Sequence, residues 1–193
     1  MRWNWPNLLT WTRIVLVPVF VLLFYVPDTW VSPPMKNVSA AAIFLFAAIT
    51  DWLDGWLARS LNQTSAFGAF LDPVADKLIV AAALILLVQL QRADVLIAVI
   101  IIGREIAISA LREWMAKIGR SRSVAVSFIG KLKTTVQMVA ILLLLHWDPL
   151  FGRIPVRFAG TLLIDVAAAL TLISMIIYLR RALPVATADD DAS

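Results

Sequence analysis

Four aspartates with helical spacing mark the part of the sequence that is suited to chemistry. They lie in or beside apolar stretches, three residues apart in the first pair and four apart in the second: Asp51, Asp54, Asp72 and Asp76. On two helices these spacings place each pair on one face. Because a carboxylate is costly within a membrane, such residues indicate a functional site. Four carboxylates brought together at low dielectric repel one another, so we expect bound cations to offset their charge.

The donor type and the neighbours of the aspartates predict which ligands they serve. The sequence has no cysteine, and carboxylate oxygens select hard ions such as magnesium, manganese or calcium. Four aspartates suit two ions, and paired ions typically assist displacement at phosphorus. Gly55 and Ala58 share the acidic face and leave room for a bulky ligand, with Arg59 beside them to meet a phosphate. The plainer alternatives are that the first pair caps a helix end and that Asp72 is the N-cap before Pro73, which is compatible with metal binding.

The elements that must position these residues are apolar helices. Of the 193 residues, 61% are hydrophobic and 16% are charged, whereas a soluble domain has about 45–50% and about 25%. We therefore predict an all-α integral membrane protein with six transmembrane helices, over residues 8–26, 38–58, 70–90, 95–114, 132–147 and 158–178. Short breaks between them predict one domain over residues 1–182, followed by a polar, disordered tail over residues 183–193.

Lysine and arginine are concentrated on one side of the predicted bundle. An even number of spans puts both termini on the same side, and that side also receives Arg59, Lys117 and Arg180. The positive-inside rule therefore predicts that both termini and the acidic motif face the cytoplasm. The net charge of +4 comes from basic residues beside apolar segments, which favours contact with membrane lipids and not with nucleic acid.

Several basic residues fall at the ends of predicted spans or inside apolar sequence. Arg104 and Arg112 are eight residues apart, which places them on roughly one face of a helix. Glu105 is a possible neutralising partner for them. The basic residues that flank the acidic cluster, and that we expect to bind a phosphate group of a second ligand (the acceptor, if the site catalyses displacement at phosphorus), are Arg13, Arg104, Arg112, Lys131 and Lys133.

Residues 51–76 resemble the signature of the CDP-alcohol phosphatidyltransferase family, D-x2-D-G-x2-A-R-x8-G-x3-D-x3-D, at every fixed position. The resemblance implies a six-helix membrane fold that is usually dimeric, two divalent cations (magnesium, or alternatively manganese) and a cytidine-diphosphate site near the cytoplasmic surface. It implies that Asp76 is the general base and shares in metal binding with Asp51, Asp54 and Asp72. It also implies that the nucleotide site is lined by Gly55, Ala58, Arg59 and Gly68.

Three other segments, residues 7–18, 103–116 and 123–134, resemble the bacterial phosphatidylglycerophosphate synthases within this family. The whole resemblance covers about residues 3–140. It implies transfer of the phosphatidyl group from CDP-diacylglycerol to sn-glycerol 3-phosphate, giving phosphatidylglycerol phosphate and CMP. We expect one direct displacement, catalysed by a homodimer in the bacterial inner membrane with its active site facing the cytoplasm.

Two other functions are compatible with the sequence. The first is a member of the same family with a different acceptor, such as inositol phosphate or phosphatidylglycerol. The second is a divalent-cation transporter, because carboxylates within a membrane also mark ion pathways. A transporter predicts acidic residues distributed through the depth of the membrane, whereas the four aspartates of the motif gather at one side.

Overall fold

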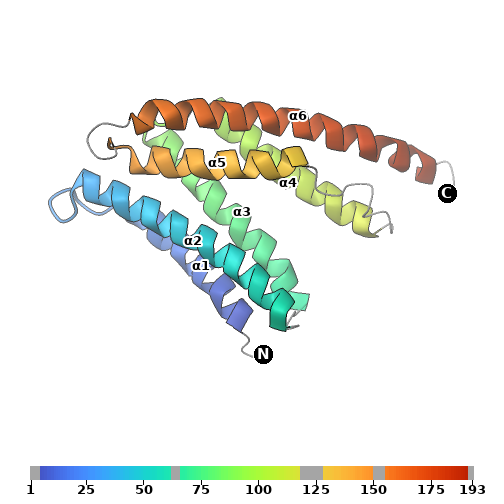
Figure 1. The fold of residues 1–193 in the computed structure, drawn as a ribbon, viewed down its shortest axis with the longest axis horizontal. Helices are drawn as coiled ribbons and strands as arrows, with labels where there is room; N and C mark the ends of the chain where they lie inside the picture. Colours follow the sequence, from blue (N-terminus) through green and yellow to red (C-terminus); the bar gives the residue numbers. More distant parts are fainter. Residues whose placement is uncertain (1–4, 62–65, 118–127, 150–154, 191–193) are drawn as a thin grey trace.

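In a computed structural model of the protein, residues 5–61, 66–117, 128–149 and 155–190 are described, and their regular structure is entirely α-helical. This agrees with the predicted all-α class. Six helices are present in these residues (Figure 1): α1 Trp5–Leu22, α2 Pro33–Leu61, α3 Ala66–Gln89, α4 Val95–Lys117, α5 Phe128–His146 and α6 Val156–Asp190.

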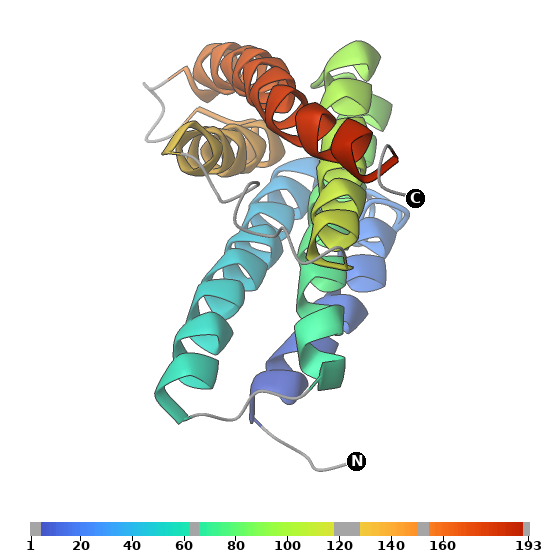
Figure 2. The same ribbon diagram turned by 90° about the vertical axis from the view of Figure 1, so that its right-hand side faces the viewer.

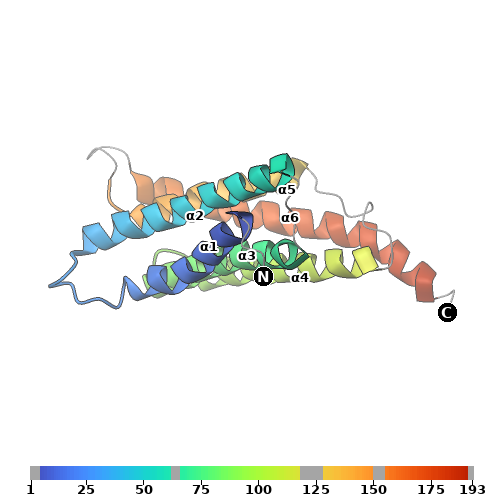
Figure 3. The ribbon, with the colours of Figure 1, turned by 90° about the horizontal axis from the view of Figure 1, so that it is seen from below.

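Successive helices run in opposite directions. The C-terminal ends of α1, α3 and α5 lie toward the left of Figure 1, and those of α2, α4 and α6 lie toward the right. Viewed from below, the connection between α1 and α2 lies at the same end as the start of α6 (Figure 3). The end of α2, the start of α3 and the end of α4 therefore point to one end of the molecule, where the sequence predicts the acidic and basic residues to gather.

Two groups of three helices make up the fold (Figures 1 and 2). In the first group α1 packs against both α2 and α3, and in the second group α6 packs against both α4 and α5. Contacts of α2 with α5 and of α3 with α4 join the two groups. Buried apolar side chains from all six helices form the common core, with Phe20, Phe44, Leu84, Ile101 and Ile164 among them. This packing fixes the relative positions of α2, α3 and α4, on which the motif residues lie.

A glycine brings α5 and α6 together. A Cβ atom built on Gly160 of α6 would lie 2.9 Å from Cγ of Leu144 on α5, closer than side chains normally approach. Small residues allow membrane helices to pack at short distance in this way. Gly160 therefore allows the first turns of α6 to pack closely against the end of α5.

Large apolar side chains are exposed on the outer faces of several helices, including Ile85 on α3, Val99 on α4 and Phe158 on α6. Large apolar side chains that are exposed on several helices mark contact with other molecules or with a membrane. Among the described residues, one helical segment, Val156–Arg180 (25 residues), is long and apolar enough to cross a membrane. Thr10–Leu22 and Leu132–His146 are shorter apolar helices.

The predicted ends of three helices are wrong. α1 ends at Leu22, where the helical bonding gives way to a tighter turn in which the backbone N–H groups of Phe24 and Tyr25 donate three residues back. α2 begins at Pro33, within a predicted break, because proline fits the first turn of a helix. The tail predicted to be disordered from residue 183 is instead helical as far as Asp190, where α6 ends. Residues added to a helix that is already formed need no new nucleus, so the tail continues α6 although it contains Pro184.

A polar network joins the helix ends opposite the acidic motif. Arg92, between α3 and α4, donates to the carbonyls of Leu144 (3.2 Å) and Leu145 (3.0 Å) at the end of α5. It also donates to Oδ1 of Asn37 on α2 at 2.7 Å, and its guanidinium lies 4.8 Å from the centroid of the Trp147 ring. These contacts satisfy carbonyls that a helix end leaves unpaired, and they hold α2, α5 and the α3–α4 connection together.

Candidate active site between helices α2, α3 and α4

A pocket of about 330 Å³ brings together the acidic and basic residues that the sequence singles out. Asp51 comes from α2 and Asp76 from α3, while Arg104 and Arg112 come from α4. The complete lining is Asp51, Pro73, Asp76, Lys77, Arg104, Glu105, Ile108, Ser109 and Arg112. We call the α2–α3 side, with Asp51 and Asp76, the acidic wall, and the α4 side, with Arg104 and Arg112, the basic wall, although Lys77 lies on α3 and Glu105 on α4.

The acidic wall is tied to α1. Nη1 of Arg13 donates to Oδ1 of Asp51 at 2.5 Å, across the contact between α1 and α2. Arg13 is 1% exposed, whereas the side chain of Asp51 is 45% exposed. The pair thus anchors a pocket carboxylate to a buried cation and leaves part of that carboxylate open to a ligand.

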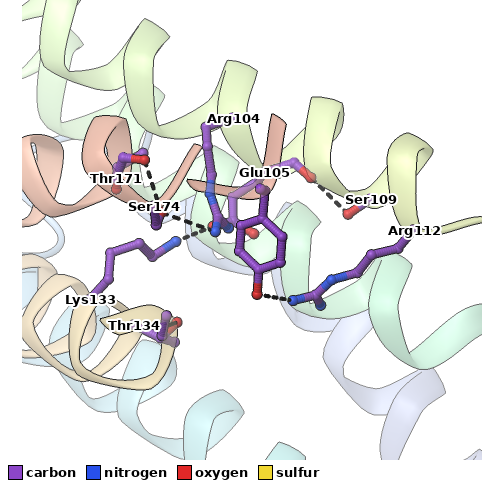
Figure 4. Close-up of polar contacts among 10 residues, drawn as sticks. Arg104, Glu105, Ser109, Arg112, Lys133, Thr134, Thr171 and Ser174 are labelled. Carbon is purple, nitrogen blue, oxygen red and sulfur yellow. Dashed lines mark hydrogen bonds and ion pairs between the residues drawn. The ribbon is translucent and has the colours of Figure 1, made fainter. Parts of the chain in front are cut away.

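The basic wall is held by contacts with α5 and α6 (Figure 4). Nη2 of Arg104 donates to Oγ of Ser174 on α6 at 3.1 Å, and Nη1 donates to Oε1 of Glu105 at 3.3 Å. The same Oε1 accepts from Nζ of Lys133 on α5. Because Arg104 and Lys133 are both buried, this shared carboxylate compensates two cations that have lost their water.

Arg112 lies two turns beyond Arg104 on α4 and is exposed to the pocket. Its Nη2 donates to Oη of Tyr178 on α6 at 2.9 Å. Ser109, which also lines the pocket, donates its hydroxyl to the carbonyl of Glu105 at 2.7 Å, one turn earlier in the helix. Among its described lining residues, the pocket therefore presents one exposed guanidinium, that of Arg112, and a serine whose hydroxyl proton is already donated within its own helix.

The structure assembles part of the predicted site directly. Asp51, Asp76, Arg104 and Arg112 line the pocket, Arg13 reaches it through Asp51, and Lys133 reaches it through Glu105. The remaining predicted residues lie on α2, α3 and α5, but their side chains fall outside the described part of the structure: Asp54, Gly55, Ala58, Arg59, Gly68, Asp72 and Lys131.

The chemistry of the described donors fits a hard cation. Asp51 and Asp76 both line the pocket and offer only carboxylate oxygens. Within the described residues no group of three acidic, histidine or cysteine side chains could hold a metal ion. Two of the four predicted ligands, Asp54 and Asp72, are outside that set, so the four-carboxylate site stays a prediction.

An apolar groove of about 220 Å³ adjoins the polar pocket between α3 and α4. Lys77 and Glu105 line both, so the two spaces meet at these side chains. The other lining residues of the groove are apolar: Val74, Leu78, Val80, Ala81, Ile102 and Ile106. A polar site that continues into an apolar groove suits a ligand with a charged head and a hydrocarbon chain.

Sequence reasoning missed the contribution of α6. It treated the chain after about residue 140 as a generic apolar segment, yet Ser174 and Tyr178 contact the two pocket arginines. These residues are four positions apart and so share one helix face. A serine and a tyrosine at this spacing, facing the basic helix, would have been the available signal.

Comparison with known proteins settles the family. The profile of the CDP-alcohol phosphatidyltransferase family matches residues 3–182. The chain belongs to this family. It is 55% identical, over 184 residues, to the CDP-diacylglycerol–glycerol-3-phosphate 3-phosphatidyltransferase of Escherichia coli strain K12, covering 94% of this chain and 96% of that protein. A protein of the same name from Shigella flexneri serotype 5b is 54% identical over the same shares.

Family membership confirms the resemblance that the aspartate motif carries. The match also extends past residue 140 to residue 182, and so includes most of α6. The residues of α6 that contact the pocket arginines thus lie within the CDP-alcohol phosphatidyltransferase domain.

Proposed function

We propose that this chain transfers the phosphatidyl group of CDP-diacylglycerol to sn-glycerol 3-phosphate, forming phosphatidylglycerol phosphate and CMP. The observation that carries the proposal is 55% identity, over nearly the full length of both chains, to an enzyme whose name states this reaction. The pocket supports it, because carboxylates suited to a cation-bound pyrophosphate face arginines suited to the phosphate of the acceptor.

The reaction is a direct displacement at the phosphorus that carries the diacylglycerol. The primary hydroxyl oxygen of glycerol 3-phosphate forms the new P–O bond, the P–O bond to CMP breaks, and Asp76 accepts the hydroxyl proton. No covalent intermediate is needed. Ser109, the hydroxyl residue of the described pocket lining, already donates its proton within its own helix.

The acidic motif would hold two divalent cations, Mg²⁺ or Mn²⁺, through Asp51, Asp54, Asp72 and Asp76. When bound, the cations neutralise the pyrophosphate and the charge that develops as CMP leaves. Arg13 orients Asp51 through their ion pair. Gly55, Ala58, Arg59 and Gly68 complete the nucleotide site.

The acceptor phosphate binds at the basic wall. Arg112 is its direct ligand in this proposal, because it lines the pocket and is exposed, whereas Arg104 is buried against Ser174 and Glu105. Arg13 pairs with Asp51 and Lys133 pairs with Glu105, so both add positive potential near the pocket without contacting the phosphate. Lys131, near the start of α5 in the sequence, is proposed to add to this potential. This arrangement selects glycerol 3-phosphate over acceptors without a phosphate, such as inositol or serine.

The enzyme is proposed to cross the bacterial inner membrane six times as a homodimer, with both termini and the active site on the cytoplasmic side. The alternating helix directions and the exposed apolar faces support this topology. Charges of the active site interrupt the apolar sequence of α2 and α4, and polar residues of this kind are characteristic of functional sites in membranes. Residues 1–182 form its single domain, the range that nearly coincides with the family match.

An acyl chain of CDP-diacylglycerol is proposed to lie in the apolar groove between α3 and α4. The groove meets the polar pocket at Lys77 and Glu105, so a lipid can keep its chain in the bilayer while its pyrophosphate reaches the aspartates. Lys77 stands at the junction, where its positive charge suits the phosphate next to the glycerol backbone.

The deciding experiment is an assay of the purified protein in detergent with CDP-diacylglycerol and a panel of acceptors. Release of CMP with glycerol 3-phosphate, and little with inositol phosphate, inositol, serine or phosphatidylglycerol, is expected. Preference for another acceptor would refute the proposed acceptor but keep the transferase chemistry. Divalent-cation uptake into proteoliposomes without CMP release would instead support a transporter.

A further inference from the structure

Tyr178 contacts both arginines of the pocket. Its hydroxyl oxygen accepts from Nη2 of Arg112 at 2.9 Å. The centroid of its ring lies 5.5 Å from Cζ of Arg104 and 5.4 Å from Cζ of Arg112. One side chain of α6 therefore bridges two cations that stand two turns apart on α4.

These contacts are of a kind that fixes a guanidinium in place. A cation within about 6 Å of an aromatic centroid is attracted by the electrons of the ring face. The hydrogen bond from a charged donor adds a directional constraint. Arginine has many rotamers, so a side chain that is held at both its charge and one N–H group is better prepared for a ligand.

The surroundings of Tyr178 distinguish it from an interfacial tyrosine. A tyrosine of a membrane interface exposes its hydroxyl to water or to headgroups. Tyr178 is 2% exposed, and it belongs to a small apolar cluster with Ile108 and Met115 of α4. Tyr25, in the connection between α1 and α2, is 66% exposed and is the only other tyrosine of the sequence.

We propose that Tyr178 is a positioning residue for the acceptor, which holds Arg112, with Arg104 behind it, in the orientation that binds the phosphate of glycerol 3-phosphate. This inference rests on the proposed function. The apolar cluster of Ile108 and Met115 fixes the ring, the ring and hydroxyl fix the guanidinium, and the guanidinium meets the ligand. Tyr178 does not touch the reacting atoms in this scheme.

The test compares Tyr178→Phe, which removes only the hydroxyl, with Tyr178→Leu, which also removes the ring. The Michaelis constant for glycerol 3-phosphate should rise about three- to tenfold in the first variant and about ten- to a hundredfold in the second. The constant for CDP-diacylglycerol should stay within about twofold of wild type in Tyr178→Phe, since that substrate meets the acidic wall. Tyr25→Phe is the matched control and should change neither constant.

A double-mutant cycle separates positioning from folding. If Tyr178 acts through Arg112, then Tyr178→Phe added to Arg112→Ala should raise the constant for glycerol 3-phosphate by less than about twofold further. An additive effect, an equal effect on both substrates, or no effect of Tyr178→Phe would overturn the inference. Absence of turnover by the wild-type enzyme with glycerol 3-phosphate would instead overturn the proposed function, and with it the acceptor role of Tyr178.

Discussion

Arg13 of α1 and Asp51 of α2 form an ion pair of 2.5 Å in which the cation is buried and the carboxylate is half-exposed. In the proposed enzyme the Asp51 carboxylate has two partners: the buried guanidinium of Arg13 and, on its exposed side, a divalent cation. A buried charge is tolerated when it is paired, and loss of its partner is costly even where the pair itself adds little.

The first prediction concerns the stability of this pair. Asp51→Ala should abolish activity and also lower the free energy of unfolding by about 1–3 kcal/mol, because the buried Arg13 loses one of its charged or polar partners. Thermal unfolding in detergent measures the loss. Adding Arg13→Met should restore most of it without restoring activity, since an apolar side chain of similar length needs no charged partner. Additive losses in the double variant would contradict the coupling.

The second prediction concerns metal. Treatment with EDTA should abolish CMP release, and added Mg²⁺ or Mn²⁺ should restore it, because clustered carboxylates repel a pyrophosphate unless cations intervene. The measurement is turnover against free cation concentration, with thermal unfolding as a check that the protein remains folded. Full turnover in metal-free buffer would refute the two-cation site.

The third prediction concerns the proton acceptor. Asp76→Asn should lower turnover by about 10²–10⁴-fold, the usual loss of a general base, and disturbed metal binding would add to it. Most of the affinity for CDP-diacylglycerol should remain, because the other three aspartates are unchanged. Equilibrium binding of the nucleotide lipid, measured beside turnover, distinguishes the two effects. Near wild-type turnover would eliminate Asp76 as the base.

Four residues of the pocket lining, Asp51, Asp76, Arg104 and Arg112, could be singled out from the sequence because their signals are local. The spacing of Asp51 from Asp54 and of Asp72 from Asp76, and the apolar runs around them, can be recognised without knowledge of packing. The contacts that orient the site join distant positions: 38 residues separate Arg13 from Asp51, 28 separate Glu105 from Lys133, and 66 separate Arg112 from Tyr178. Such pairs depend on which helix faces meet, which periodicity alone does not specify.

The ends of the helices also depend on more than local sequence signals. The breaks around Pro33 and at the end of α6 were predicted from residue types that often interrupt helices. Proline in a first turn begins a helix instead of breaking one, and a short polar segment that follows a long helix can extend it. Local composition predicted that six helices exist, and the context of each end determined where they stop.

The fourth prediction concerns the apolar groove between α3 and α4. Ala81→Leu should narrow the groove and raise the Michaelis constant for long-chain CDP-diacylglycerol several-fold, with no change for glycerol 3-phosphate. A short-chain analogue that does not fill the groove should be affected less. If Ala81→Leu changed the oligomeric state and left both constants unaltered, the groove would be a contact between copies and not a lipid site.

The last prediction concerns the acceptor phosphate. Arg112→Ala should raise the Michaelis constant for glycerol 3-phosphate by about ten- to a hundredfold, since a hydrogen bond to a charged group contributes roughly 1.5–3 kcal/mol. The constant for CDP-diacylglycerol should be nearly unchanged, whereas Arg59→Ala should act mainly on that substrate. Lys117→Ala is the matched control on the same helix, because Lys117 is exposed and its ion pair among the described residues is a surface pair with Glu113, one turn earlier.

The contrast between Arg112 and Lys117 tests position and not merely charge. Both are basic residues of α4, but only Arg112 lines the pocket. If binding depended on the net positive field alone, the two substitutions would weaken acceptor use equally and high salt would remove both effects. If Arg112→Ala instead raised the constants of both substrates in parallel, Arg112 would support the structure of the pocket, and the phosphate ligand would have to be sought among Arg104, Lys131 and Lys133.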